Sequence, residues 1–170
     1  AIFRDRFATV TIRSTAPFTP SDHGFNDSRD LGVFMHTGYA GENIRTDPGR
    51  IKLPDAYPRI INGSWFKPQA RVFVPILDPT KRASFSFYLE NHHPTVPRLS
   101  VVLSSKRLCR EVQVEHYTPG RFTIEFEADE YDRVVQNAGS FVTPDWNAGD
   151  RGFLEVDHGQ YDQRCEGPAL

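Results

Sequence analysis

The sequence lacks three features that would each point to one class of protein. No apolar segment approaches the roughly 18 residues of a membrane-spanning helix, and the first six residues, AIFRDR, lack the apolar core of a signal peptide. The 20 basic and 22 acidic residues leave a formal net charge of -2, so no basic face is expected to neutralise a phosphate backbone. We therefore expect a soluble chain with no membrane span and no nucleic-acid partner.

Cysteine is scarce, and the two cysteines fit no zinc pattern. Cys109 and Cys165 either form one disulfide in an oxidising compartment or remain two thiols in a reducing one. Cys109 falls inside a predicted strand, where an inert buried thiol is expected. The sequence also lacks a Gly-x-Ser-x-Gly elbow and a glycine-rich phosphate loop, and we predict no cofactor and no metal ion.

Long amphipathic helices are missing as well, which argues against a parallel α/β sheet. Instead, short segments alternate apolar with polar residues, as half-buried strands do, and they recur every 11 to 16 residues with Pro-rich turns between them. The clearest segments are Phe7–Ser14, Ala70–Ile76, Ala83–Leu89, Leu99–Leu103, Val112–Val114 and Phe122–Phe126.

This cadence predicts an all-β fold: one antiparallel β-sandwich domain spanning residues 1–170, Ig-like or jelly-roll-like, with about nine or ten strands. Only Glu127–Gln136 has the composition for a short helix. The irregular segment Thr37–Lys67, rich in Gly and Pro, is expected to cover the sandwich or to supply short edge strands.

One pattern occurs near both ends of the chain. Asp30–His36 is echoed by Asp150–His158, and each copy follows a Phe and a Thr-Pro turn. Residues 1–40 are thus interpreted as a repeated or permuted strand pair, in which Gly32 and Gly152 mark bulges or close backbone approach.

The run Ile61–Phe66, the strand Ala70–Ile76 ending in Pro-Ile, and the Leu-Gly-Val triplet at residues 31–33 resemble the small β-sandwich modules of bacterial glycosyltransferases and other surface-polysaccharide proteins. Those modules have a Gly-x-Trp opening and a late Leu-Gly-Val closing strand. Here the Leu-Gly-Val element comes first, which indicates a permuted arrangement or the tail of one module fused to a second. The resemblance implies a non-catalytic, glycan-contacting accessory module.

Two other kinds of chemistry are weighed against surface roles. Glu90 and His92 lie on one side of a strand end, and His116 or His158 would complete a metal site if it came near. Glu125 and Glu127 share the polar face of one strand, where two carboxylates could act on a glycosidic bond. In both cases we expect the simpler role: His92 and His93 as exposed turn residues, and the two glutamates as a solvated face.

Aromatic residues in loops give the better lead, because a sugar ring stacks on an aromatic face while polar neighbours bond its hydroxyls. The alternative is that both tryptophans fill the ends of the core. The predicted ligand-binding residues are Trp146 with Asp145, Asn147 and Asp150 in one turn, Trp65 with Asn62 in another, and Tyr161.

The sequence favours a non-catalytic carbohydrate-binding accessory module, with carbohydrate or another protein domain as its partner. Two alternatives are retained: a protein–protein interaction or assembly domain, and a metal-assisted or carboxylate-based carbohydrate-active enzyme.

Overall fold

We analysed a computed structural model of the chain, which describes all residues except 1–2, 48, 139, 143–147, 151 and 163–170. The chain separates into two compact units. The larger comprises Ala8–Tyr131, and the smaller comprises residues 1–7 together with residues 132–170.

The first sheet of the larger unit is built around β1 (Phe3–Ser14), of which this unit contains the part from Ala8 onward. β1 pairs with β4 (Gln69–Pro75) and with β6 (Arg98–Ser104), and β6 pairs with β7 (Cys109–Glu115). The β1–β6 and β6–β7 ladders are antiparallel.

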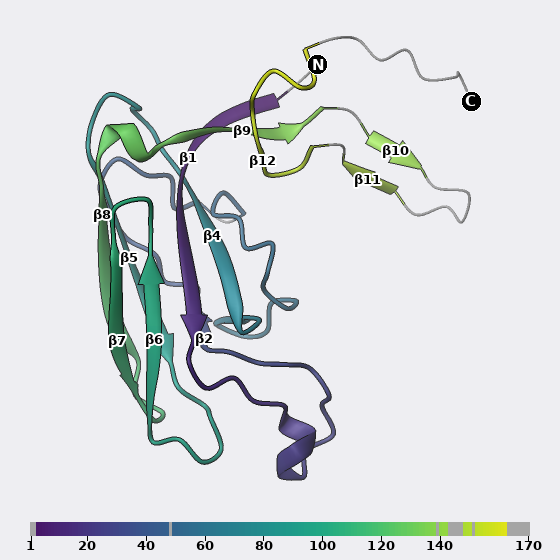
Figure 1. The fold of residues 1–170 in the computed structure, drawn as a ribbon, viewed down its shortest axis with the longest axis vertical. Coiled ribbons are helices and arrows are strands. Elements are labelled where there is room, and N and C mark those ends of the chain that lie inside the picture. Colours follow the sequence, from purple (N-terminus) through teal and green to yellow (C-terminus); the bar gives the residue numbers. More distant parts are fainter. Residues whose placement is uncertain (1–2, 48, 139, 143–147, 151, 163–170) are drawn as a thin grey trace. The chain divides into compact units, whose positions relative to one another are not determined.

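The second sheet has the order β3 (Gly63–Trp65), β2 (Phe34–His36), β5 (Ala83–Glu90) and β8 (Gly120–Phe126), and all its ladders are antiparallel. Its longest ladder joins β5 to β8 from Ala83↔Phe126 to Leu89↔Gly120. Figure 1 labels the strands of both sheets except β3.

The core forms between the two sheets because apolar residues alternate along their strands. Val10 and Ile12 of β1 belong to the same buried cluster as Phe85 and Phe87 of β5 and Ile124 of β8. The prediction of an all-β antiparallel sandwich is confirmed for this unit. The described residues form twelve strands, more than the expected nine or ten, because five of them are only two or three residues long.

The long connection from β1 to β2 contains the 3₁₀ helix η1 (Pro20–His23), which lies beyond the C-terminal end of β1 (Figure 1). Gly24 ends this helix at a φ of 87°, a left-handed conformation that glycine adopts without a steric penalty. Two hydrogen bonds between the backbones of Phe18 and Leu31 close the base of the loop. Its shape is therefore fixed by backbone pairing rather than by strand formation.

The expected strand Asp30–His36 is shorter in the structure. Leu31 makes an isolated bridge with Phe18, and regular pairing begins only at Phe34. Gly32 donates its backbone N–H to the carbonyl of Phe66 at 2.8 Å, and a Cβ at Gly32 would lie 2.8 Å from the carbonyl oxygen of Lys67. Close backbone approach at Gly32 is thereby confirmed.

Only one turn of helix forms in the segment that was expected to hold a short helix. The 3₁₀ helix η2 (Ala128–Glu130) starts with a capping box between Glu127 and Glu130, and the chain then enters β9 (Asp132–Asn137). The β-branched pair Val134 and Val135 is buried, so strand pairing replaces the helical continuation.

The segment between β2 and β4 covers the sandwich, as predicted. It is attached by isolated bridges, including Ile44↔Ile76 and Lys52↔Phe73, and it buries Ile44 and Ile51 in the core cluster.

Cys109 is exposed at the start of β7, so the prediction of a buried thiol is wrong. It occupies the first position of an outer strand, where the core does not reach its side chain.

The smaller unit contains a second set of pairings. β9 pairs with residues Phe3–Phe7 of β1 and with β12 (Glu155–Val156), while β10 (Ser140–Val142) and β11 (Ala148–Asp150) pair antiparallel. Gly152 has a φ of 71°, and a Cβ there would lie 2.6 Å from the ring of Tyr161. Within the described residues, no helix is long and apolar enough to cross a membrane.

Candidate functional site

A pocket of about 350 Å³ opens at one end of the larger unit. Four rings follow one another along its wall, with centroids 5.9 Å apart from Phe18 to Trp65, 5.5 Å from Trp65 to His92, and 5.3 Å from His92 to Tyr117. Successive rings stand at 65° to 78° to each other. The volume is within the range of small-molecule sites, and the wall presents both ring faces and ring edges.

Four separate segments bring these rings together. Phe18 comes from the β1–β2 loop, Trp65 from β3, His92 from the segment after β5, and Tyr117 from the β7–β8 turn. Phe34 of β2 packs behind Trp65, with ring centroids 5.5 Å apart. Because the segments belong to different strands and turns, their convergence depends on the closed sandwich.

The rim of the pocket carries few polar groups. Asn26 and Asp27 line it from the β1–β2 loop, beside the 63% exposed ring of Phe25. Hydrogen bonds from the side chain and backbone of Arg29 lower the pKa of Asp27 to about 2, so its carboxylate is ionised at neutral pH. The guanidinium of Arg29 lies over the ring of Tyr57, 4.9 Å from its centroid. The rim thus offers hydrogen-bond acceptors next to an apolar wall.

Tyr117 is held in an unusual conformation. Its φ is 52°, in the left-handed region that bulky residues rarely adopt, and its side chain is 61% exposed. A hydrogen bond from its backbone N–H to the carbonyl of Asn91 and stacking on His116, with centroids 3.8 Å apart, hold it there. Backbone strain of this kind is concentrated at binding sites, because the fold stabilises it for a reason other than local preference.

Asn91 organises the segment that carries the histidines. It is fully buried, its Nδ2 donates to the carbonyls of Val96 and Val114, and its Oδ1 accepts the backbone N–H of His93 at 2.8 Å. The residues after β5 are therefore fixed to β7 rather than left as a mobile turn. Nothing in the sequence indicated this role, because Asn is equally common in exposed turns.

A carboxylate shared by two histidines lies beside the pocket. Glu90 Oε2 is 2.8 Å from His36 Nε2 and 3.2 Å from His92 Nε2. Partial burial raises the pKa of Glu90, but the hydrogen bonds from the two histidines outweigh this effect and the pKa lies below its ordinary value. The predicted proximity of Glu90 and His92 is confirmed, but within the larger unit the third member is His36 rather than His116.

The expectation that His92 and His93 are exposed turn residues is wrong. His92 is half-buried by the rings on either side of it, and His93 is only 7% exposed. No group of three or more His, Cys, Asp or Glu side chains in the described residues is arranged to hold a metal ion.

The predicted binding residues have different outcomes. Trp65 is half-exposed and lines the pocket. Asn62 does not line this pocket: it occupies the two-residue turn before β3 at a φ of 66°, and its carbonyl accepts the backbone N–H of Thr37. Asp145, Trp146 and Asn147 lie outside the described residues.

The remaining two predicted residues belong to the smaller unit. Asp150 pairs with Ser140 at the end of the β10–β11 ladder. Tyr161 donates its hydroxyl to Glu155 Oε2 at 2.7 Å. Cys165 also lies outside the described residues, so both alternatives for the cysteines remain open.

Phe18 and Phe25 are pocket residues that the sequence did not single out. Each stands in a loop dense with Pro, Asp and Gly, where an aromatic residue is not part of an alternating strand pattern. That contrast is the signal that could have identified them.

Glu125 lies on β8 and Glu127 follows this strand, and Glu127 lacks the pKa shift that a general acid needs. Arg82 forms an ion pair with Glu127, and this hydrogen bond is the main reason why the pKa of Glu127 is lowered. A general acid in glycoside hydrolysis needs the opposite shift. Glu125 stays on the exposed face of the strand, in agreement with the simpler expectation.

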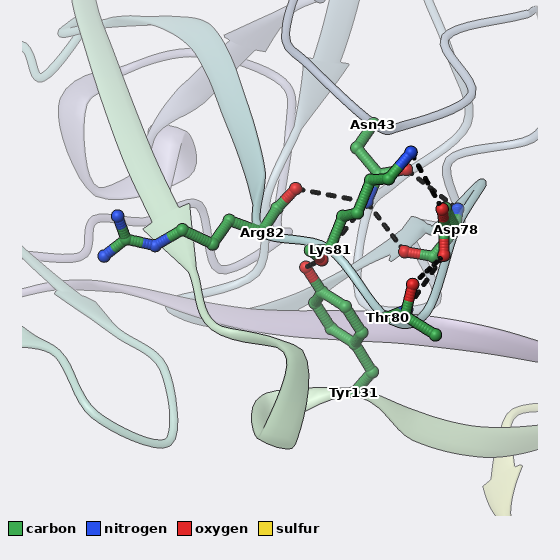
Figure 2. Close-up of polar contacts among 6 residues, drawn as sticks. All are labelled: Asn43, Asp78, Thr80, Lys81, Arg82 and Tyr131. Carbon is green, nitrogen blue, oxygen red and sulfur yellow. Dashed lines mark hydrogen bonds and ion pairs between the residues drawn. The ribbon is translucent and has the colours of Figure 1, made fainter.

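A dense polar cluster lies at the Arg82 end of β5, as Figure 2 shows. Asn43 Nδ2 lies within hydrogen-bond distance of the carbonyls of Asp78, Lys81 and Arg82, and its Oδ1 accepts the backbone N–H of Asp78. Tyr131 donates its hydroxyl to the carbonyl of Lys81 at 2.8 Å. These bonds stabilise the turn from β4 to β5, which explains the cluster without a ligand.

Comparison of the chain with models of protein families, with curated proteins and with solved structures finds no match. The resemblance to polysaccharide-associated modules therefore stays a prediction.

Proposed function

We propose that this chain is a non-catalytic carbohydrate-binding module, of the kind that accompanies glycosyltransferases and other surface-polysaccharide proteins, and that it binds sugar in the aromatic pocket. The observation that carries the proposal is the half-exposed ring of Trp65 within a wall of four rings, next to the polar side chains of Asn26 and Asp27. The apolar C–H face of a sugar would stack on a ring while its hydroxyls bond the rim.

The test is a glycan array followed by isothermal titration calorimetry with the best ligands. Two variants separate binding from folding. Trp65→Ala removes the platform but also its packing against Phe18 and Phe34, and so it is expected to abolish binding with some loss of stability. Tyr117→Gly removes a pocket ring while relieving the positive φ, so it is expected to stay folded.

We expect Tyr117→Gly to weaken binding by about tenfold, because stacking on one ring accounts for about 1–2 kcal/mol. The matched control is Tyr88→Ala, which removes a 37% exposed tyrosine from β5 and should leave affinity unchanged. If no saccharide on the array binds the wild-type chain, the proposal is wrong.

A second candidate function is protein interaction, supported by exposed apolar side chains on the turn before β3. Ile60 is 52% exposed and Ile61 is 86% exposed at the tip of this turn. Self-association is one form of protein interaction, and sedimentation of the chain over a hundredfold range of concentration tests it. Self-association that Ile61→Lys abolishes would favour assembly through this turn, and a monomer at every concentration would count against it.

A further inference from the structure

A second cavity, of about 320 Å³, shares the side chain of Phe18 with the aromatic pocket but differs from it in chemistry. It is lined by Asp22, His23 and Asp30 of the β1–β2 loop and by His93. The aromatic pocket has mainly rings, whereas this cavity has two carboxylates and two imidazoles. Phe18 thus stands between an apolar compartment and a polar one.

The hydrogen bonds of His93 determine its tautomer. Its Nδ1 accepts the backbone N–H groups of Thr95 and Val96, both at 3.1 Å, so Nδ1 carries no proton. The ring proton of neutral His93 is therefore on Nε2. Burial is the main cause that lowers the pKa of His93, and His23 and His116 add to the effect, which keeps the ring neutral.

The Nε2–H of His93 is a donor without a partner among the described residues. The side chain is more than nine-tenths buried, and since Nδ1 faces the backbone of residues 95–96, the Nε2 edge is the part of the ring available to the cavity. A ligand atom that accepts this proton can reach it from the cavity, which His93 lines.

The same arrangement argues against a metal ion. A metal bound at Nε2 would displace the proton to Nδ1, where it would face two backbone N–H donors. The lining suits instead a group that accepts a hydrogen bond from His93 and donates one to a carboxylate of Asp22 or Asp30. A hydroxyl group does both.

We propose that this cavity is a second sugar subsite, which binds the hydroxyls of a neighbouring sugar unit while the aromatic pocket stacks the first. The ligand is thus at least a disaccharide, and it lies on both sides of Phe18. This proposal rests on the proposed function, because it extends the same site.

The experiment compares the tightest-binding disaccharide or longer glycan from the array with its constituent monosaccharides, by calorimetry. We expect the larger ligand to bind about tenfold more tightly. In the double variant Asp22→Ala/His23→Ala this advantage should fall to about twofold or less. Both residues are exposed on η1, so the variant is expected to fold. Glu125→Ala, an exposed carboxylate on β8, is the control and should keep the full advantage.

A spectroscopic readout monitors His93 without substituting it. Long-range ¹H–¹⁵N spectra should show His93 as the neutral Nε2–H tautomer, with an Nε2 shift that moves on adding the larger ligand and not on adding the monosaccharide that fills the aromatic pocket. If sugars bind but the larger ligand has no advantage, or His93 does not respond to it, the second subsite is wrong while the proposed function stands. If nothing binds, both proposals fail.

Discussion

The two ends of strand β5 differ in where their polar groups find partners. At the Arg82 end, the side chain of Asn43 and the hydroxyl of Tyr131 bond the backbone of the β4–β5 turn, and no ligand is needed to explain the arrangement. At the Glu90 end, rings line a pocket, Tyr117 has a strained backbone, and His93 has a donor with no partner among the described residues. The first pattern stabilises the fold, and the second is typical of a binding site.

The largest effect is expected from Asn91→Ala, which breaks the support of the pocket. Removing the side chain leaves the carbonyls of Val96 and Val114 and the N–H of His93 without their bonds. We expect the free energy of unfolding to fall by about 3 kcal/mol, measured by urea denaturation.

Asn91→Asp is the matched variant, because it keeps the acceptor for His93 but loses the Nδ2 donors. If the free energy of unfolding of Asn91→Ala falls by less than about 1 kcal/mol, other contacts hold the segment after β5 in place.

Asn43→Ala tests the Arg82 end of β5. We expect the free energy of unfolding to fall by about 2 kcal/mol, because the variant loses the hydrogen bonds of the Asn43 side chain and because alanine tolerates a φ of 59° poorly. Asn43→Gly loses the same hydrogen bonds but adopts the positive φ without strain. The difference in the free energy of unfolding between the two variants therefore reports the cost of the backbone conformation.

Sugar affinity should be unchanged in every Asn43 variant that remains folded. A change in sugar affinity would show that the Arg82 end and the pocket are coupled. It would contradict the view that the Arg82 end stabilises the fold and the Glu90 end binds the ligand.

Acidification should affect the pocket end first. The pKa of His93 is lowered by folding, so its contribution to stability is complete above the ordinary histidine pKa of 6.5 and is lost as the pH falls below that value. The pKa of Asp78 is lowered to about 2 by hydrogen bonds from Thr80 and by Lys81, so the turn end should not respond in this range.

Amide NMR shifts followed from pH 7.5 to 5 check this order. We expect the shifts of residues 91–97 to move and those of residues 78–82 to stay constant, together with a lower urea midpoint at pH 5. Amide shifts that change at both ends over the same pH range would contradict this order.

The smallest effect is expected from Arg82→Ala. The side chain of Arg82 is 77% exposed and its ion pair with Glu127 is open to solvent, so the midpoint of thermal unfolding should not change measurably. A clear decrease that disappears in 0.5 M salt would show that this pair contributes to the turn end after all.

Some of the site was predictable from the sequence. Trp65 was recognised as an aromatic residue outside the clear strands. Glu90 and His92 were recognised as neighbours at one strand end, because spacing along a strand is a local property. The approach of Phe18, His36 and His93 was not predictable, since these residues come from segments that meet only after the two sheets close.

The sequence by itself determined the antiparallel sandwich of the larger unit, because the alternation in segments such as Ala83–Leu89 leaves only one face of each strand able to enter a core. It also determined that Gly32 would stand where two backbones meet. Only the tertiary structure decided that four rings from four segments form one pocket and that His93 is buried while lining a second cavity. Burial and hydrogen-bond partners belong to the folded chain as a whole, and no local pattern contains them.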